Sequence, residues 1–227
     1  MKTISFHVKQ LLLLILFPSF TFSQFASISL PFKKEPIIEK KDSLLLRFIE
    51  TKTQNIVISD NLKTMYYWLN FARKNPKSFN SLVLQPYLLA FPQLKGVYAE
   101  TLQKDLISSS GLSLLNLNTT LTIMAQEHAK DMANHKTNIS HTSSNGKTFA
   151  DRIRAYGINY CAGENLSFGS GSPLLQLVLL FLDINYTSLG HRKSLLNPAY
   201  TEIGLGESVL SNGEVFYVQD FSCSPSQ

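Results

Sequence analysis

Four polar residues whose side chains suit catalysis or metal binding stand at the ends of predicted secondary-structure elements. His141 follows a predicted helix, and Glu164 begins a predicted strand in GENLSFG. Asp183 follows an apolar helix, and His191 lies in TSLGHRKSLLNP, shortly before an Asn-Pro dipeptide. Two imidazoles and two carboxylates that converge in one cleft would suit a divalent metal ion or a proton-transfer pair. These four residues are therefore the candidate cleft residues of the chain.

The other histidines and the common catalytic motifs add no further candidates. His128 and His135 are seven residues apart, which is two helical turns. That spacing, roughly 10 Å along the axis, is too long for two ligands of one ion without a third group between them. We therefore interpret His128 as a packed core histidine. The sequence contains no His-Glu-x-x-His pair, no Gly-x-Ser-x-Gly nucleophile motif and no phosphate-binding glycine loop.

Hydrophobic periodicity predicts the helices that must position these residues. The segment 119–135 carries its apolar residues on one face and is the clearest helix. A second helix covers 148–156 and stops at Gly157. A third covers 173–182, PLLQLVLLFL, which is apolar on almost every side, so we expect it to be buried.

The amino-terminal half is also predicted to be helical. Asp60 is expected to cap a helix whose apolar residues recur at three-and-four spacing, and Asn75-Pro76 ends this helix. A shorter helix follows and stops before Pro86, and a further helix covers 97–107.

The carboxyl-terminal part of the sequence changes to strand-like patterns. EIGLGESVL and EVFYVQDFS flank Ser211-Asn212-Gly213, and Asn-Gly is the strongest short hairpin signal in a sequence. ENLSF, residues 164–168, is a candidate third strand. We therefore predict an α+β fold with helices on both sides of a small antiparallel sheet.

The first two dozen residues have the pattern of a secretory signal peptide. Lys2 and Lys9 flank the start, residues 11–17 form a short apolar core, and small residues precede a cleavage site before Gln24. The competing interpretation is a membrane anchor, but a span needs about 20 apolar residues and this run is too short. We divide the chain into a signal peptide (1–23), a lead-in (24–58), one domain (59–223) and a tail (224–227). Whether the lead-in folds onto the domain or acts as a tether stays open.

Composition restricts the classes of partner. The chain has 227 residues, of which 44% are hydrophobic and 16% charged, and its formal net charge of +5 falls when Lys2 and Lys9 are removed with the signal peptide. It has no stripe of Arg and Lys with aromatic residues between them, so nucleic-acid binding gains no support.

Cys161 and Cys223 both lie in the exported part, where an oxidising compartment permits a disulfide. Two cysteines allow a single pairing, which would close a loop between sequence positions 161 and 223 and stabilise the fold by at most roughly 4 kcal/mol. The alternative is two free buried thiols.

Four segments resemble, in order, the successive blocks of the CAP superfamily, which comprises the cysteine-rich secretory, antigen 5 and pathogenesis-related proteins and is also called the SCP domain. The segments are ISHTSSNGKTFADRI, YGINYCAGENLSFG, SLGHRKSLLNPAYTEIGLG and YVQDFS. LNFARKNPKSF resembles the first helix of the bacterial branch. The resemblance covers residues 62–222, with an enlarged segment at 83–112.

The resemblance implies a three-layer α-β-α sandwich with a cleft lined by two histidines and two acids. His141 matches the first histidine, Glu164 the acid of the Gly-Glu-Asn block, and His191 the second histidine. Family members often carry the second acid as a glutamate three residues after a tryptophan. This helix has no tryptophan, and the shorter Asp183 is the nearest candidate. We therefore expect a His-Glu-His site, and we expect Arg192 to support the fold by pairing with an acid.

Three functional hypotheses follow from the resemblance. The first is a secreted binding module, extracellular or periplasmic, because superfamily members are associated with sterol or lipid binding and with signalling outside the cell. The second is a metal-assisted hydrolase in which His141 and His191 hold zinc or another divalent ion, with Glu164 as base. The third makes the four residues a buried hydrogen-bond network that supports the fold. We favour a non-enzymatic monomer without a transmembrane anchor.

Overall fold

The structure is a computed structural model that describes residue 30 and residues 34–135 and 139–223. The predicted signal peptide and the predicted tail lie outside the described residues. The helices, in chain order, are α1 (Ser43–Thr53), α2 (Asp60–Lys74), α3 (Pro76–Phe79), the π-helix η1 (Asn80–Leu84), α4 (Gln85–Ala90), the 3₁₀-helix η2 (Pro92–Leu94), α5 (Val97–Ser108), α6 (Thr119–His135), α7 (Phe149–Ala155), α8 (Pro173–Leu182) and α9 (Gly190–Leu195). None of these described helices has the length and apolar character needed to cross a membrane.

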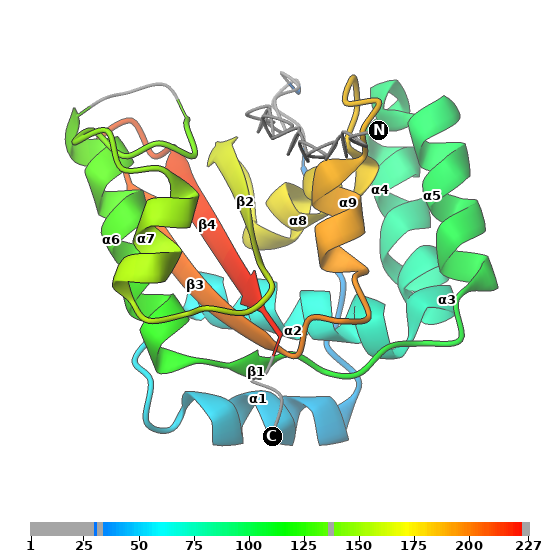
Figure 1. Cartoon of the computed structure of the whole chain (residues 1–227). Helices are drawn as coiled ribbons and strands as arrows, with labels where there is room; N and C mark the ends of the chain where they lie inside the picture. The colour runs from blue at the N-terminus through cyan, green and yellow to red at the C-terminus, as the bar shows by residue number, and fades with distance from the viewer. Residues whose placement is uncertain (1–29, 31–33, 136–138, 224–227) are drawn as a thin grey trace, which may run out of the picture.

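One sheet with the strand order β1-β3-β4-β2 forms the middle layer (Figure 1). Its strands are β1 (Asn116–Leu117), β2 (Ala162–Gly169), β3 (Glu202–Val209) and β4 (Val215–Ser222). The predicted hairpin is confirmed as β3 and β4, and the predicted third strand pairs antiparallel with β4. The short β1 pairs parallel with β3, so the sheet is mixed rather than purely antiparallel as expected. Helices α6 and α7 cover one face, and α2, α8 and α9 cover the other, which confirms the α-β-α sandwich.

Helix α6 packs directly onto the backbone of β3. A Cβ atom on Gly204 would lie 2.1 Å from the backbone of Leu121, and one on Gly206 would lie 2.3 Å from the backbone of Ala125. Only glycine permits this approach, because any side chain on these two positions would overlap the helix. Strand β3 and helix α6 are thereby held in close contact over about one helical turn.

The larger core lies between the opposite face of the sheet and the remaining helices. The predicted apolar helix is confirmed as α8, in which every residue from Leu174 to Leu182 is buried. Helix α1 packs onto the same core through Leu45 and Ile49. Glu35, further upstream, accepts a hydrogen bond from the backbone N–H of Ser172 at 2.8 Å. The described part of the lead-in is therefore folded onto the domain.

Two predicted helix boundaries are wrong for local reasons. The residue that caps α2 is Ser59, whose hydroxyl accepts the Leu62 N–H, and Asp60 instead occupies the first turn. The helix expected to stop before Pro86 continues through it, because η1 leads directly into α4. Pro86 lies in the first turn of α4, where a proline needs no backbone N–H to continue the helix.

Two long-range links close the domain. The predicted disulfide joins Cys161 to Cys223, with 5.5 Å between their Cα atoms. On α2, the fully buried Arg73 donates hydrogen bonds to four backbone carbonyls, those of Ser113, Leu195, Asn197 and Tyr200. Helix α2 is thus fixed to the loop that connects α9 to β3.

Candidate functional site

Glu164 on β2 anchors one half of the predicted cleft. Its side chain is 1% exposed, and Oε1 accepts a hydrogen bond from Nδ1 of His141 at 2.7 Å. Oε2 accepts a short hydrogen bond from the guanidinium of Arg152. Burial alone opposes ionisation, but the His141 hydrogen bond and the Arg152 charge hold the pKa of Glu164 below its usual value. Glu164 is therefore a buried carboxylate.

The ionised Glu164 fixes the orientation of the His141 ring. Because a carboxylate only accepts hydrogen bonds, Nδ1 of His141 carries a proton that faces Glu164. Nε2 has no hydrogen-bond partner among the described residues, and the side chain is 22% exposed. His141 thus presents its second ring nitrogen to solvent or to a ligand.

Arg152 on α7 is a site residue that the sequence reasoning missed. Helix α7 begins with a capping box in which Thr148 and Asp151 satisfy each other's backbone N–H groups. This helix start places Arg152 against the sheet, where Nη1 donates to the His141 carbonyl at 3.0 Å and to Ser143 Oγ at 3.1 Å. Arg152 therefore joins Glu164 to the loop that carries His141.

Asp183 and His191 form the other half of the predicted cleft. Asp183 ends α8 in the left-handed conformation, with φ of 53°. Its Oδ1 accepts from Nδ1 of His191 at 2.5 Å, and its Oδ2 accepts the backbone N–H of Arg192 at 2.9 Å. The Arg192 side chain pairs with Asp105 at 3.1 Å, so its expected pairing with an acid is confirmed.

The structure thus arranges the four candidates as two separate histidine–carboxylate pairs. The pairs are connected through β2, because Asn165 follows Glu164 and donates to the backbone carbonyl of His191 at 3.4 Å. Consecutive strand residues point to opposite faces, so Glu164 and Asn165 serve different sides of the sheet.

A zinc centre needs at least three protein ligands grouped around one point. Within residues 34–135 and 139–223, no three His, Cys, Asp or Glu side chains are grouped closely enough to hold a metal ion. Both oxygens of Glu164 accept hydrogen bonds from His141 and Arg152, so Glu164 acts as a hydrogen-bond acceptor here and not as a ligand. A three-ligand centre of His141, Glu164 and His191 does not fit this arrangement, and zinc binding stays a prediction.

Asp220 on β4 is a second site residue that the sequence reasoning missed. It lies opposite Glu164 in the pairing of β2 with β4 and is fully buried. Neither of its carboxyl oxygens has a hydrogen-bond partner among the described residues when it is treated as a carboxylate. The sequence signal that could have identified Asp220 is an acidic residue within the strand-like run EVFYVQDFS.

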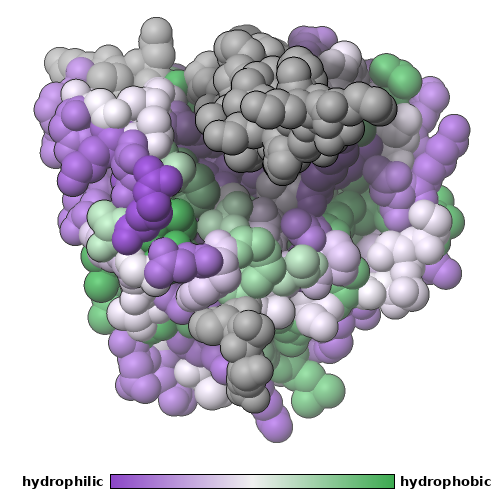
Figure 2. Space-filling view, viewed as in Figure 1, coloured by the Kyte–Doolittle hydropathy of each residue, from purple (hydrophilic) through white to green (hydrophobic). Residues whose placement is uncertain are grey.

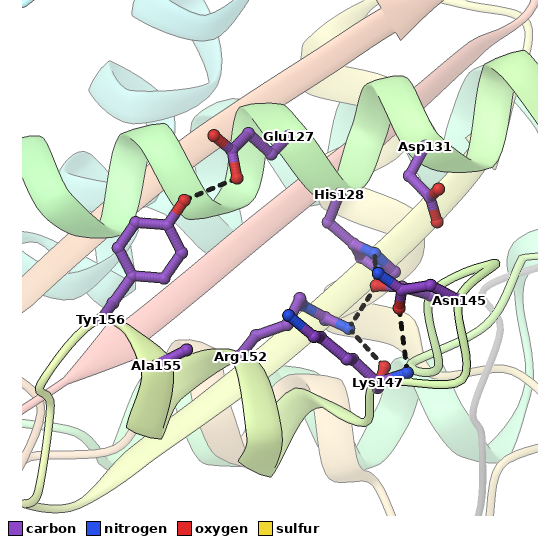
Figure 3. Close-up of a pocket in the computed structure, with 9 residues that line it drawn as sticks. Glu127, His128, Asp131, Asn145, Lys147, Arg152, Ala155 and Tyr156 are labelled. Atoms are coloured by element: carbon purple, nitrogen blue, oxygen red, sulfur yellow. Dashed lines mark hydrogen bonds between the residues drawn. The ribbon is translucent and has the colours of Figure 1, made fainter.

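A polar cavity of about 470 Å³ lies between α6, α7 and the loop that joins them (Figure 3). Its lining consists of Glu127, His128, Asp131, Ser143, Asn145, Lys147, Arg152, Ala155 and Tyr156. Arg152 belongs to both the cavity wall and the Glu164 network. The cavity is therefore connected to His141 through one buried side chain.

His128 forms the buried inner wall of this cavity. It is 1% exposed, as expected for a packed histidine. Nε2 lies 2.8 Å from the Ser140 carbonyl, and Nδ1 lies 3.2 Å from Ser143 Oγ. Because a carbonyl only accepts, Nε2 carries a proton. Burial lowers the pKa of His128, which favours the neutral ring.

The sequence of this chain is similar to that of a known family and of a bacterial relative. The sequence profile of the cysteine-rich secretory protein family, abbreviated CAP, matches residues 98–221. The chain is 35% identical over 97 residues to the uncharacterized protein YkwD of Bacillus subtilis, a match that covers 42% of this chain and 35% of YkwD. The chain therefore spans about a third of this curated relative, so activities of the whole relative do not transfer to it.

Two solved structures match part of this chain. One is an extracellular protein containing an SCP domain from Bacillus anthracis, with 29% identity and a TM-score of 0.39 over 50% of this chain and 35% of that chain. The other is an outer surface protein from Borrelia burgdorferi, with 26% identity and a TM-score of 0.43 over 56% of this chain and 88% of that chain. The profile match spans more than half of the chain and includes His141, Glu164, Asp183 and His191. The chain therefore belongs to the cysteine-rich secretory protein (CAP) family.

Proposed function

We propose that this protein is an extracellular binding module that holds a small polar ligand in the cavity between α6 and α7. The observation that carries the proposal is the double role of Arg152, which lines the cavity and also bonds to Glu164. A ligand in the cavity would therefore contact the network that orients His141. Pockets of this size are typical of small-molecule sites.

The cavity lining favours a polar ligand over the lipid or sterol expected from the resemblance. Most lining side chains are charged or hydrogen-bonding, and hydrophilic side chains also gather over α6 and α7 in Figure 2. Lys147 has no ion-pair partner among the described residues, and Glu127 is held only by the Tyr156 hydroxyl at 2.5 Å. One available cation and one available anion would suit a small zwitterion, with its acidic group near Lys147 and its basic group near Glu127.

The hydrolase hypothesis has less support from the same geometry. A general base works best when its pKa lies near the working pH. The pKa of Glu164 is held below its usual value, and both of its oxygens accept hydrogen bonds. Glu164 would therefore be a weak base, which favours binding without turnover.

The Asp183–His191 pair supports the structural hypothesis for that half of the predicted cleft. The side chains are 0% and 2% exposed, so a ligand could reach them only if the fold opened. We therefore assign ligand contact to the His141 side of β2 and fold stabilisation to the His191 side.

Calorimetric titration with matched ligands tests the proposal. The probes are a free α-amino acid, its N-acetyl derivative, its amide and cholesterol, each with and without a metal chelator. Replacing Lys147 by Gln should weaken binding of the free amino acid by roughly tenfold, about the value of one charge pair near a protein surface, while affinity for the amide changes little. Lys130→Gln on α6 is the control, because Lys130 is exposed and does not line the cavity.

Each outcome bears on the proposal. Binding of the zwitterion that falls in Lys147→Gln and not in Lys130→Gln supports it. Binding of cholesterol alone, or binding that is equal in all variants, would contradict it. The same calorimetry with zinc, on the wild type and on His141→Ala, tests a separate prediction. Loss of zinc binding in the variant would support a role for His141 as a metal ligand.

A further inference from the structure

Asp220 occupies an enclosed position at the centre of the sheet. In the strand pairing it is opposite Glu164 on β2 and Gly204 on β3, and paired residues share one face. Because residue 204 is glycine, β3 contributes no side chain beside the Asp220 carboxyl group. Helix α6 contacts the Gly204 backbone at this level instead. The Asp220 carboxyl group is consequently sealed between two strands and a helix, with 0% of the residue exposed.

The hydrogen-bond partners of Asp220 depend on its proton. As a carboxylate, Asp220 has two buried oxygens without any donor among the described residues, which is a costly state for a polar group. Its carboxyl group lies within hydrogen-bonding reach of Glu164. Two carboxylates cannot bond to each other, because neither has a donor, whereas one proton between them supplies it.

The charged groups around Asp220 decide which acid holds that proton. Glu164 on β2 and Arg152 on α7 both act on Asp220, and His128 on α6 acts on Glu164. Arg152 and His141 both donate to Glu164 and so stabilise its charge. Asp220 has no such donor among the described residues, which favours the proton on Asp220.

We propose that Asp220 is a protonated positioning residue that donates a hydrogen bond to Glu164. Burial and the nearby charge of Glu164 raise the pKa of Asp220 well above its usual value, in agreement with a neutral acid at neutral pH. Glu164 then accepts from Asp220 as well as from His141 and Arg152. The third donor would fix the carboxylate in the plane that aims His141 outward and holds Arg152 in the cavity wall.

This role as a positioning residue rests on the proposed binding function, whereas the location of the proton does not. The test therefore uses the full-length folded protein without any ligand. Infrared difference spectroscopy between Asp220→Asn and the wild type should show, at neutral pH, the carbonyl band of a protonated carboxylic acid in the wild type only. The control is Asp60→Asn, which removes an ordinary carboxylate. The Asp60 side chain is 98% exposed.

Two results would overturn the assignment. One is the absence of a protonated-acid band from the wild type. The other is a band that survives in Asp220→Asn and disappears in Glu164→Gln, which would place the proton on Glu164 instead.

Nitrogen NMR of the His141 ring tests the positioning role. The Nδ1–H signal of His141 should stay close to its wild-type position in Asp220→Asn, because the amide still donates, and should shift or broaden in Asp220→Leu, which cannot donate. An unchanged signal in Asp220→Leu would contradict the role. If Asp220→Leu does not fold, the comparison of Asp220→Asn with the wild type still decides, since loss of the His141 signal there would also contradict it. Failure of the zwitterion to bind would remove the proposed function and leave these two spectroscopic results intact.

Discussion

Oδ1 of Asp183 lies 2.5 Å from Nδ1 of His191, and both side chains are buried. The second oxygen of Asp183 accepts the backbone N–H of Arg192 at 2.9 Å. One carboxylate therefore fixes both the imidazole and the start of α9, at the point where the chain leaves α8.

Removal of this carboxylate should destabilise the fold. Asp183→Ala removes the carboxylate that accepts from His191 Nδ1 and from the Arg192 N–H, and we expect a loss of about 3 kcal/mol in the free energy of unfolding. Asp183→Asn should lose less, because asparagine tolerates the left-handed conformation and can still accept a hydrogen bond. Urea denaturation followed by circular dichroism measures both variants, and equal stability of Asp183→Ala and the wild type would contradict this role.

Arg73 should be among the most sensitive positions for stability. Arg73→Met would remove the donor to four backbone carbonyls, those of Ser113, Leu195, Asn197 and Tyr200. We therefore expect the free energy of unfolding to fall by about 3–5 kcal/mol. Arg47→Met on the exposed side of α1 is the matched control and should change stability by less than about 0.5 kcal/mol. Denaturant unfolding of the two variants checks this, and similar midpoints would refute it.

Reduction of the Cys161–Cys223 disulfide should lower stability without loss of the fold. The bridge closes a loop with a sequence separation of 62, for which chain entropy gives at most roughly 4 kcal/mol. Denaturation curves with and without a reducing agent measure the difference. Thiol titration of the denatured, unreduced protein is the control, and two reactive thiols would show that the bridge had not formed.

His128 should make stability depend on pH on the acid side of neutrality. Its folded pKa lies below the usual 6.5, so the unfolded chain binds the proton first as the pH falls. The contribution of the neutral ring is therefore complete above about pH 6.5 and is lost progressively below it, by about 1.4 kcal/mol for each unit of depression. His128→Gln should flatten this part of the stability profile. His135→Gln is the control, because the His135 side chain is 55% exposed, and an unchanged slope in His128→Gln would contradict the prediction.

The sequence predicted the elements whose signals are local. The apolar run of α8, the one-sided periodicity of α6 and the Asn-Gly hairpin each depend on residues close together in the chain. The cap of α2 was misassigned because Ser59 and Asp60 are adjacent and both can cap, and only the structure shows that Ser59 accepts the Leu62 N–H. The helix through Pro86 was missed because a π-helix directly precedes it and carries no recognised sequence signal.

The sequence named four candidate residues but did not show how they pair. His141, Glu164, Asp183 and His191 all bond to another member of the set, yet the strand between them divides them into two pairs. Asp220 escaped notice because every residue of β4 is buried, so alternation of polar and apolar residues marks neither face. Partners of this kind are set by tertiary packing, which a single sequence does not display.

The hydrogen bonds of Arg73 also have a consequence for the order in which the domain folds. Three of its four acceptor carbonyls come 122 to 127 residues later in the chain. A nascent chain that ends before residue 195 would contain the cation but not those carbonyls, and burying the cation without them is strongly unfavourable. Final docking of α2 must therefore wait for nearly the last loop of the domain. The amino-terminal helices and the terminal hairpin should consequently acquire their native packing together, after synthesis of the whole domain.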